Sequence, residues 1–364
     1  MKFCFYGSIA NGLKGKPIGG GEQQLALLTK TLVILGHDVI VLDFINEEDE
    51  YIEGVKIKSL KMRLKRGTFL KIFYKELKAT KADIYYARIR SSIHLVALYA
   101  AYKQKAKFVY HLASDLDSLS FNQRWKGFYS KLNSKVKIIK HIVHTEILFP
   151  VILGKADLII TQNEEQFLNI LNKGYKDVIK VSNLFEPHEI TNPLHIPEKP
   201  YFLFVGSLDS RKGVVELEEI INKCENNTFY VIGKPRDKYG ETFISNQKLI
   251  NIVYLGHQDH GSVIKYLSNS IGLLNTSMNE GFSNAFIEAW SVGKPVISLN
   301  SNPSKVLNKH NLGIAFNGNV KKMIDFISNY KPGQFNSKRI TTYVSKNHAC
   351  INNTQIIINK IKAL

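Results

Sequence analysis

Two glutamates, Glu280 and Glu288, lie eight residues apart in a segment whose residue types suit a phosphorylated ligand. Glu280 is followed by Gly281, and Ser283 or Asn284 can cap a helix that begins there. Loop amides and the positive end of a helix dipole attract a diphosphate. Carboxylates on either side of it can accept hydrogen bonds from hydroxyl groups. The spacing therefore predicts a site for a molecule with a sugar on each side of a phosphate, such as a nucleotide sugar.

Two cations follow an apolar strand expected over residues 201–205. The strand leads through Gly206 into a short loop that carries Arg211 and Lys212. A guanidinium grips phosphate through its planar fork, and an ammonium binds it as a point charge. We interpret the pair as a diphosphate contact; an exposed basic turn is the alternative.

A glycine-rich loop is expected between the first strand and the first long helix. Gly20 and Gly21 precede Glu22 there, and glycines allow the backbone to approach a ligand closely at a helix start. A plain tight turn would use the same residues.

Polar residues also follow two predicted strands of the N-terminal half. His111 ends one of them, and Asp115 or Asp117 beyond it could orient the histidine or bind an acceptor. Arg88 or Arg90, at the end of another strand, is a candidate for binding an anionic acceptor. A histidine at a strand end is often structural, so that alternative stands.

Strand and helix signals alternate along the whole chain, which predicts βαβ units and parallel sheets. Four prolines between 187 and 200 mark an interdomain linker. We therefore predict an N-terminal domain over 1–188, a linker over 189–200 and a C-terminal domain over 201–364, whose last helix can pack back on the first domain. Strands are expected at 2–6, 38–44, 83–86, 108–111, 157–161, 201–205, 229–232, 252–255, 272–275 and 295–299.

At Glu280, Glu288 and the following Glu-Ala-x-x-x-Gly-x-Pro-Val-Ile run, the sequence resembles the retaining GT-B glycosyltransferases of family 4. The segment 204–213 resembles the strand–loop element of that family. Ser207 stands where the family often has arginine, and residues 300–304 depart from its usual glycine-rich element. The resemblance implies an α/β GT-B fold, with two Rossmann-like domains facing each other across a cleft.

The resemblance also implies roles for individual residues. Glu288 would hold the ribose hydroxyls, while Glu280 and the loop Gly281, Phe282 and Ser283 would engage the donor sugar. Lys212 matches the lysine that contacts the donor diphosphate, with Arg211 as an additional candidate. His111 takes the place of the active-site histidine, near the donor sugar and the acceptor.

The reaction implied by this resemblance is transfer of a hexose-type sugar from a UDP- or GDP-sugar to a glycan or lipid-linked acceptor, as in cell-surface polysaccharide synthesis. Neither a cofactor nor a metal is expected, because protein cations and amides take the metal's role and no DxD-type metal motif stands out. Three alternatives remain open: a sugar-nucleotide epimerase of the same architecture, a non-catalytic nucleotide-sugar binding protein and a nucleic-acid binding protein.

The chain of 364 residues carries 49 basic and 31 acidic residues, a net charge of +18. Much of the surplus lies in two stretches, 56–81 and 124–140, the second with interleaved aromatic residues. Such stretches suit an anionic membrane surface, a nucleic acid or simply a solvated face. We favour a membrane surface over nucleic acid, since no nucleic-acid-binding motif is present. Three scattered cysteines and a short apolar start predict a cytoplasmic protein, and the basic stretches are compatible with a peripheral place on the inner membrane face.

Overall fold

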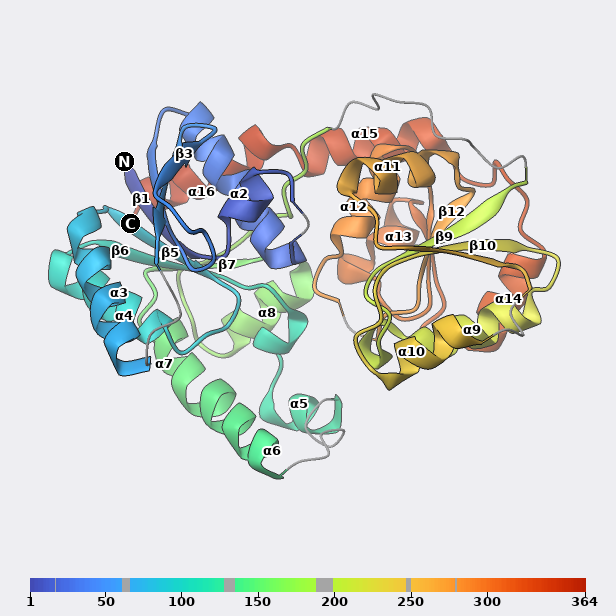
Figure 1. The fold of residues 1–364 in the computed structure, drawn as a ribbon, viewed down its shortest axis with the longest axis horizontal. Helices are drawn as coiled ribbons and strands as arrows, with labels where there is room; N and C mark the ends of the chain where they lie inside the picture. Colours follow the sequence, from blue (N-terminus) through green and yellow to red (C-terminus); the bar gives the residue numbers. More distant parts are fainter. Residues whose placement is uncertain (17, 61–65, 128–134, 188–198, 247–249, 279) are drawn as a thin grey trace. The chain divides into compact units, whose positions relative to one another are not determined.

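The computed structural model describes residues 1–16, 18–60, 66–127, 135–187, 199–246, 250–278 and 280–364. The chain divides into two compact units, one formed by Met1–Leu184 with Cys350–Leu364 and the other by Phe185–Ala349. Each unit is a β-sheet with helices packed on it (Figure 1). Residues 189–198 of the predicted linker, and the parts of the basic stretches at 61–65 and 128–134, lie outside the described residues.

The N-terminal unit contains an eight-stranded sheet in the order β3-β4-β2-β1-β5-β6-β7-β8, parallel except for the β3–β4 pair. Its strands are β1 (Lys2–Gly7), β2 (Asp38–Asp43), β3 (Glu50–Ile52), β4 (Val55–Ser59), β5 (Ile84–Arg88), β6 (Lys107–His111), β7 (Leu158–Thr161) and β8 (Val178–Lys180). Its helical segments are α1 (Ala10–Leu13), α2 (Gly20–Ile34), α3 (Arg66–Thr80), α4 (His94–Gln104), η1 (Asp115–Asp117), α5 (Phe121–Gly127), α6 (Lys135–Ile142), the π-helical η3 (Val143–Leu148), α7 (Phe149–Gly154), α8 (Glu164–Asn172) and α16 (Cys350–Lys362).

The central strand β1 shows how this sheet is buried on both faces. Phe3 and Phe5 enter one apolar cluster, whereas Cys4 and Tyr6 enter the cluster on the opposite face. This division follows from the two-residue period of a strand. Helices α2 and α16 cover the first cluster, so the last helix of the chain belongs to the N-terminal unit (Figure 1).

The C-terminal unit contains a six-stranded parallel sheet in the order β11-β10-β9-β12-β13-β14. Its strands are β9 (Tyr201–Val205), β10 (Thr228–Ile232), β11 (Ile252–Gly256), β12 (Gly272–Asn275), β13 (Val296–Ser298) and β14 (Gly313–Ala315). Its helical segments are η4 (Ser210–Lys212), α9 (Val214–Lys223), α10 (Lys238–Ser245), α11 (His260–Asn269), α12 (Asn284–Ser291), η5 (Pro303–Lys305), α13 (Val306–Lys309), α14 (Val320–Ser328) and α15 (Ser337–Asn347).

In each sheet the order in which successive strands are added changes direction at one strand. In the N-terminal unit β1 lies between β2 and β5, and in the C-terminal unit β9 lies between β10 and β12. The loops that leave the carboxyl ends of such a strand pair diverge to opposite faces, and ligands of open α/β sheets bind in the crevice between them. We therefore expect ligand-binding residues after β1 and β5 in one unit, and after β9 and β12 in the other.

Every strand that the sequence analysis predicts is present, with ends that differ by at most two residues. The strands it did not predict are β3, β4, β8 and β14. Each has three to five residues, and all four lie at or next to a sheet edge. β4 also carries lysines at alternate positions. Within the described residues, no helix is long and apolar enough to cross a membrane.

Gly213 is the position where the C-terminal unit most plainly requires a glycine. Its φ is +68°, and a Cβ built there would lie 2.2 Å from the backbone oxygen of Thr276. We expect Gly213→Ala to lower the free energy of unfolding by at least about 1–2 kcal/mol, since an L-residue is strained in this conformation before the clash is counted. Urea unfolding measures the loss. Gly67→Ala, where a Cβ meets nothing within 4 Å, is the matched control and should be neutral or stabilising; equal losses for both variants would contradict the assignment.

Candidate functional site

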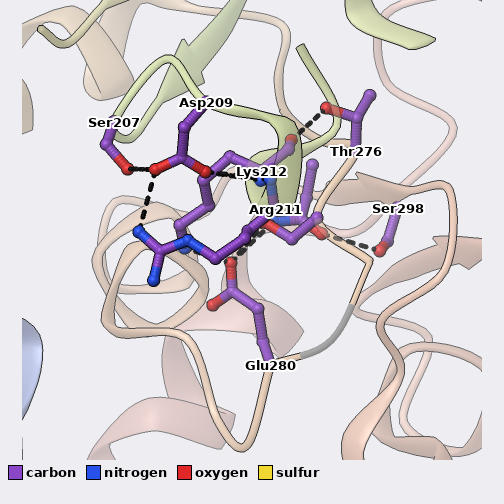
Figure 2. A network of polar contacts seen from close by, with 9 residues as sticks. Ser207, Asp209, Arg211, Lys212, Thr276, Glu280 and Ser298 are labelled. Atoms are coloured by element: carbon purple, nitrogen blue, oxygen red, sulfur yellow. Dashed lines mark hydrogen bonds and ion pairs between the residues drawn. The ribbon is translucent and has the colours of Figure 1, made fainter. Parts of the chain in front are cut away.

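The loop after β9 is organised by Asp209. This buried carboxylate accepts hydrogen bonds from the backbone N–H groups of Arg211 and Lys212 at 3.0 and 3.1 Å, and from the Ser207 hydroxyl at 2.9 Å (Figure 2). It also pairs with the Arg211 guanidinium at 3.0 Å. Arg211 is 74% exposed, so its free edge faces solvent beside the loop. Asp209 is thus the N-cap residue of η4, and its hydrogen bonds fix the direction in which the Lys212 side chain leaves the backbone.

Lys212 meets Glu280 across the point where the sheet reverses. The Nζ of Lys212 lies 2.6 Å from Oε1 of Glu280, which is 10% exposed (Figure 2). Ser277 Oγ and Asn275 Nδ2 donate to the same oxygen at 2.5 and 3.3 Å. The loop after β9 and the loop after β12 are therefore joined by a partly buried ion pair.

The charge of Glu280 is maintained by these donors. Burial raises the pKa of its carboxyl, but the Lys212 charge and hydrogen bonds from Lys212, Ser277 and Ser283 outweigh burial and hold the pKa below its usual value. Two further bonds keep the loops in register: Thr276 Oγ1 donates to the Lys212 oxygen at 2.8 Å, and the N–H of Met278 donates to the Arg211 oxygen at 3.0 Å.

The segment 281–283 leads directly into α12. Ser283 is the N-cap residue by backbone position, yet its side chain makes no capping bond and instead interacts with Glu280. Gly281 is buried, and the Phe282 ring packs against Trp290 and His348 with centroids 6.1 and 5.2 Å apart. The Phe282 side chain therefore anchors the loop that leads into α12.

Glu288 lies on the second turn of α12. Its Oε1 is 3.1 Å from Nε2 of His260, the first residue of α11. The Glu288 side chain is 14% exposed and the His260 side chain 34% exposed. The contact raises the pKa of His260: burial lowers it, but the bond to Glu288 and the charges of Glu288 and Asp259 prevail.

In the N-terminal unit, the structure brings together two other predicted residues, His111 and Arg88. They end the paired strands β6 and β5 and stand opposite each other in register. Arg88 Nη1 lies 3.0 Å from His111 Nδ1, and the Tyr86 hydroxyl lies 2.8 Å from the same nitrogen. Burial and the Arg88 charge hold the pKa of His111 well below its usual value, so the imidazole is neutral at pH 7.

Arg88 is a buried cation with neutral neighbours. Its side chain donates to Asn183 Oδ1 at 3.0 Å, and its Nε has no hydrogen-bond partner in the described part of the chain. Burial lowers its pKa to about 10, while Tyr86, Tyr110 and more distant carboxylates act in the opposite direction. A buried charge is ordinarily paired with an opposite charge. Among the described residues no carboxylate forms an ion pair with Arg88, which makes it a candidate for an anionic ligand.

The residue after Arg88 holds a strained backbone next to the glycine loop. Ile89 has a φ of +63°, unusual for a β-branched residue. His94 Nε2 donates to the Ile89 oxygen at 2.9 Å, and Tyr6 contacts His94 Nδ1 at 2.9 Å. A Cβ on Gly21 would lie 2.8 Å from the Ile89 side chain, so the glycine loop packs closely against this turn. Backbone strain of this kind concentrates at functional sites.

The remaining predicted residues lie nearby in the same unit. Gly20 is the first residue of α2. Asp115 begins η1, and its Oδ1 accepts bonds from Asn163 and Gln166 at 2.9 and 2.8 Å. Asp117 is paired with Arg90 at 3.6 Å.

Sequence reasoning missed several residues that the site depends on, namely Tyr86, Asp209, Asn275, Ser277 and His260. Asp209 could have been found, because an aspartate immediately before a helical turn is a common N-cap. The others act through side chains that arrive from different strands or helices, and local spacing carries no signal of that.

Comparisons with known proteins agree with this geometry. Residues 187–339 match the family model described as Glycosyl transferases group 1, a span that lies within the C-terminal unit and contains Lys212, Glu280 and Glu288. No curated protein sequence matches the chain.

Several solved structures share the fold over the entire chain. Sucrose-phosphate synthase (tll1590) from Thermosynechococcus elongatus is 14% identical, with coverage of 100% of this chain and 99% of that one and a TM-score of 0.73. Anabaena Alr3699/HepE, solved in complex with UDP, is 16% identical, with 100% coverage of both chains and a TM-score of 0.69. The lipopolysaccharide outer core galactosyltransferase WaaB is 20% identical, with coverage of 100% and 99% and a TM-score of 0.66.

These likenesses confirm the predicted fold class, an α/β protein with two parallel-sheet domains of the GT-B type.

Asp115 should make the stability of the protein depend on pH. Burial raises its pKa to about 6, although Asn163 and Gln166 lower it through hydrogen bonds. The folded state therefore binds the proton more tightly than the unfolded state, and stability falls as the pH rises from about 4 to about 6. Asp115→Asn removes this titration.

The test is urea unfolding at pH 5 and pH 7.5. Relative to wild type, Asp115→Asn should be more stable at pH 7.5 than at pH 5, because only the wild type then buries an ionised carboxylate. Asp325→Asn, at an exposed position of α14, is the control and should leave the pH profile unchanged. Parallel profiles for wild type and Asp115→Asn would refute the assignment.

Proposed function

We propose that the protein is a retaining glycosyltransferase that moves a hexose from a UDP- or GDP-sugar to a glycan or lipid-linked acceptor. We further propose that it acts in cell-surface polysaccharide synthesis and needs neither a metal ion nor a cofactor. The observation that carries this proposal is the Lys212–Glu280 pair at the reversal point of the C-terminal sheet, inside the region that matches the glycosyltransferase family. Solved relatives in complex with UDP support a nucleotide donor.

The donor diphosphate would bind where three positive features converge. Lys212 lies beside Glu280, Arg211 extends from the same turn as Lys212, and residues 281–283 lead into the start of α12. A bound diphosphate would draw Lys212 from Glu280, whose carboxylate would then accept from a hydroxyl of the donor sugar. Glu288 would accept from the ribose hydroxyls.

In the proposed reaction, the bond between the anomeric carbon and the diphosphate oxygen breaks, and the acceptor oxygen bonds to that carbon on the face from which the diphosphate leaves. The acceptor proton passes to the departing diphosphate. Lys212, Arg211 and the helix start stabilise the negative charge that develops on this leaving group, which is where preorganised electrostatics act most strongly.

The N-terminal unit would receive the acceptor. His111, being neutral, would serve as a hydrogen-bond partner of the donor sugar or of the attacking hydroxyl rather than as a cation. Arg88 would attract an anionic group of the acceptor. The glycine loop at Gly20 and Gly21 and the carboxyl of Asp115 would line the approach.

Turnover should depend on both members of the ion pair. We expect Glu280→Gln and Lys212→Met each to reduce kcat about 100-fold or more, the magnitude typical for loss of one electrostatic contact to a developing charge. The measurement is release of nucleoside diphosphate from a panel of UDP- and GDP-sugars with lipid-extract acceptors. Lys321→Met, on the exposed face of α14, is the control for loss of a lysine and should retain wild-type activity.

The same assay separates the competing functions. An epimerase would convert its nucleotide sugar with no acceptor present, and a binding protein would bind the donor without turnover. A nucleic-acid binding protein would ignore nucleotide sugars and bind oligonucleotides with a steep salt dependence. Unchanged rates in both variants would remove Glu280 and Lys212 from the mechanism.

We also propose that the N-terminal unit docks on an anionic membrane, which would place the protein on the cytoplasmic face of the inner membrane. The segments α6, η3 and α7 follow one another without a break in the chain (Figure 1), and they expose apolar side chains every three or four residues. The exposed residues are Val136 (76%), Ile139 (62%), Val143 (42%), Ile147 (57%) and Val151 (49%). The α6 part of this stretch carries Lys135, Lys137 and Lys140, and an apolar stripe that continues from a basic helix suits the surface of an anionic bilayer.

Vesicle sedimentation tests this docking. Ile139→Asp and Ile147→Asp should each weaken binding to phosphatidylglycerol vesicles about tenfold at low salt, because each removes one apolar side chain that would be buried in the bilayer. Charge reversal at Lys126 and Lys131 should weaken it as well. Val215→Asp, an equally exposed valine of α9 in the other unit, is the control. Equal binding to neutral vesicles would show that the basic residues form only a solvated face.

A further inference from the structure

His260 is a titratable residue of the C-terminal unit that the proposed mechanism does not use. It is the first residue of α11, and α11 packs against α12, the helix that carries Glu288. Its Nε2 lies 3.1 Å from Glu288 Oε1. The contact therefore links the start of one helix to the second turn of its neighbour.

The backbone of His260 is held in place. Asp259 caps α11, with its Oδ1 accepting from the Ser262 N–H at 3.0 Å and its Oδ2 accepting from the Ser262 hydroxyl at 2.7 Å. Val263 and Leu267 of the same helix are buried in the core of the unit. The imidazole is thus presented from a fixed helix start.

Glu288, by contrast, needs an external restraint. A glutamate in the middle of a helix has several rotamers, and fixing such a side chain costs conformational entropy. The His260 Nε2, 3.1 Å away, restricts the Glu288 carboxylate to orientations in which Oε1 accepts a hydrogen bond from it. An ionised carboxylate has about four lone-pair positions, so acceptors remain for two hydroxyl groups.

We propose that His260 is a positioning residue for Glu288: it donates from Nε2 to Oε1 and orients the carboxylate toward the two adjacent hydroxyls of the donor ribose. The inference rests on the proposed function, since it requires a nucleotide donor with its ribose at Glu288. Its consequence is that His260 contributes to affinity only for ligands that carry those hydroxyls.

Calorimetric titration with UDP and with 2′-deoxy-UDP tests this, with GDP and 2′-deoxy-GDP as the second pair. We expect wild type to prefer the ribonucleotide, and His260→Leu to bind it about tenfold more weakly, as expected for loss of one hydrogen bond to a charged group. The same variant should bind the 2′-deoxynucleotide with less than about a twofold change. His260→Gln, whose amide can donate from a similar position, should recover most of the lost affinity.

Two controls separate positioning from structure. Lys265→Gln, on the same helix, should leave both affinities unchanged, and thermal unfolding checks that every variant is folded. Equal weakening of ribo- and deoxyribonucleotide binding in His260→Leu, or no weakening of either, would overturn the inference. If wild type binds neither UDP nor GDP, the proposed function itself fails and the inference falls with it.

Discussion

The ion pair between Lys212 and Glu280 is the interaction on which the C-terminal unit depends. The two side chains come from loops on either side of the point where the strand order reverses, and Glu280 is almost wholly buried there. A carboxylate in such a place stays ionised only if cations and donors compensate for lost hydration. Lys212, Ser277 and Asn275 provide that compensation, and all three reach the same oxygen.

The surrounding backbone is shaped to bring these groups together. Gly213 lets the chain pass against the Thr276 oxygen, and the Thr276 hydroxyl in turn donates to the oxygen of Lys212. Asp209 fixes the turn from which Lys212 departs. The result is a pair of opposite charges held in contact at the point where the strand order reverses.

The N-terminal unit uses the same topology with different chemistry. Its sheet reverses between β1 and β5, and β5 ends in Arg88, whose hydrogen-bond partners His111 and Asn183 are neutral. The C-terminal unit pairs its buried Glu280 with Lys212. In the N-terminal unit, by contrast, no carboxylate among the described residues pairs with the buried Arg88, so an anionic ligand could compensate its charge. The strained turn at Ile89 and the close approach of Gly21 lie directly beside it.

Local sequence predicted a large part of the fold and several residues of the candidate site. Alternating strand and helix signals predicted two parallel-sheet domains, because periodicity reports which faces are buried. The glutamate pair was predicted from its spacing, and the Arg211-Lys212 turn and His111 were predicted because these residue types follow strands. Edge strands such as β3 and β8 were missed, since they are short and only partly buried. Tertiary structure alone decided which side chains meet. Lys212 and Glu280 are 68 residues apart, and His260 and Glu288 are 28 apart. Such contacts follow from strand order and helix packing, and spacing along the chain does not encode either.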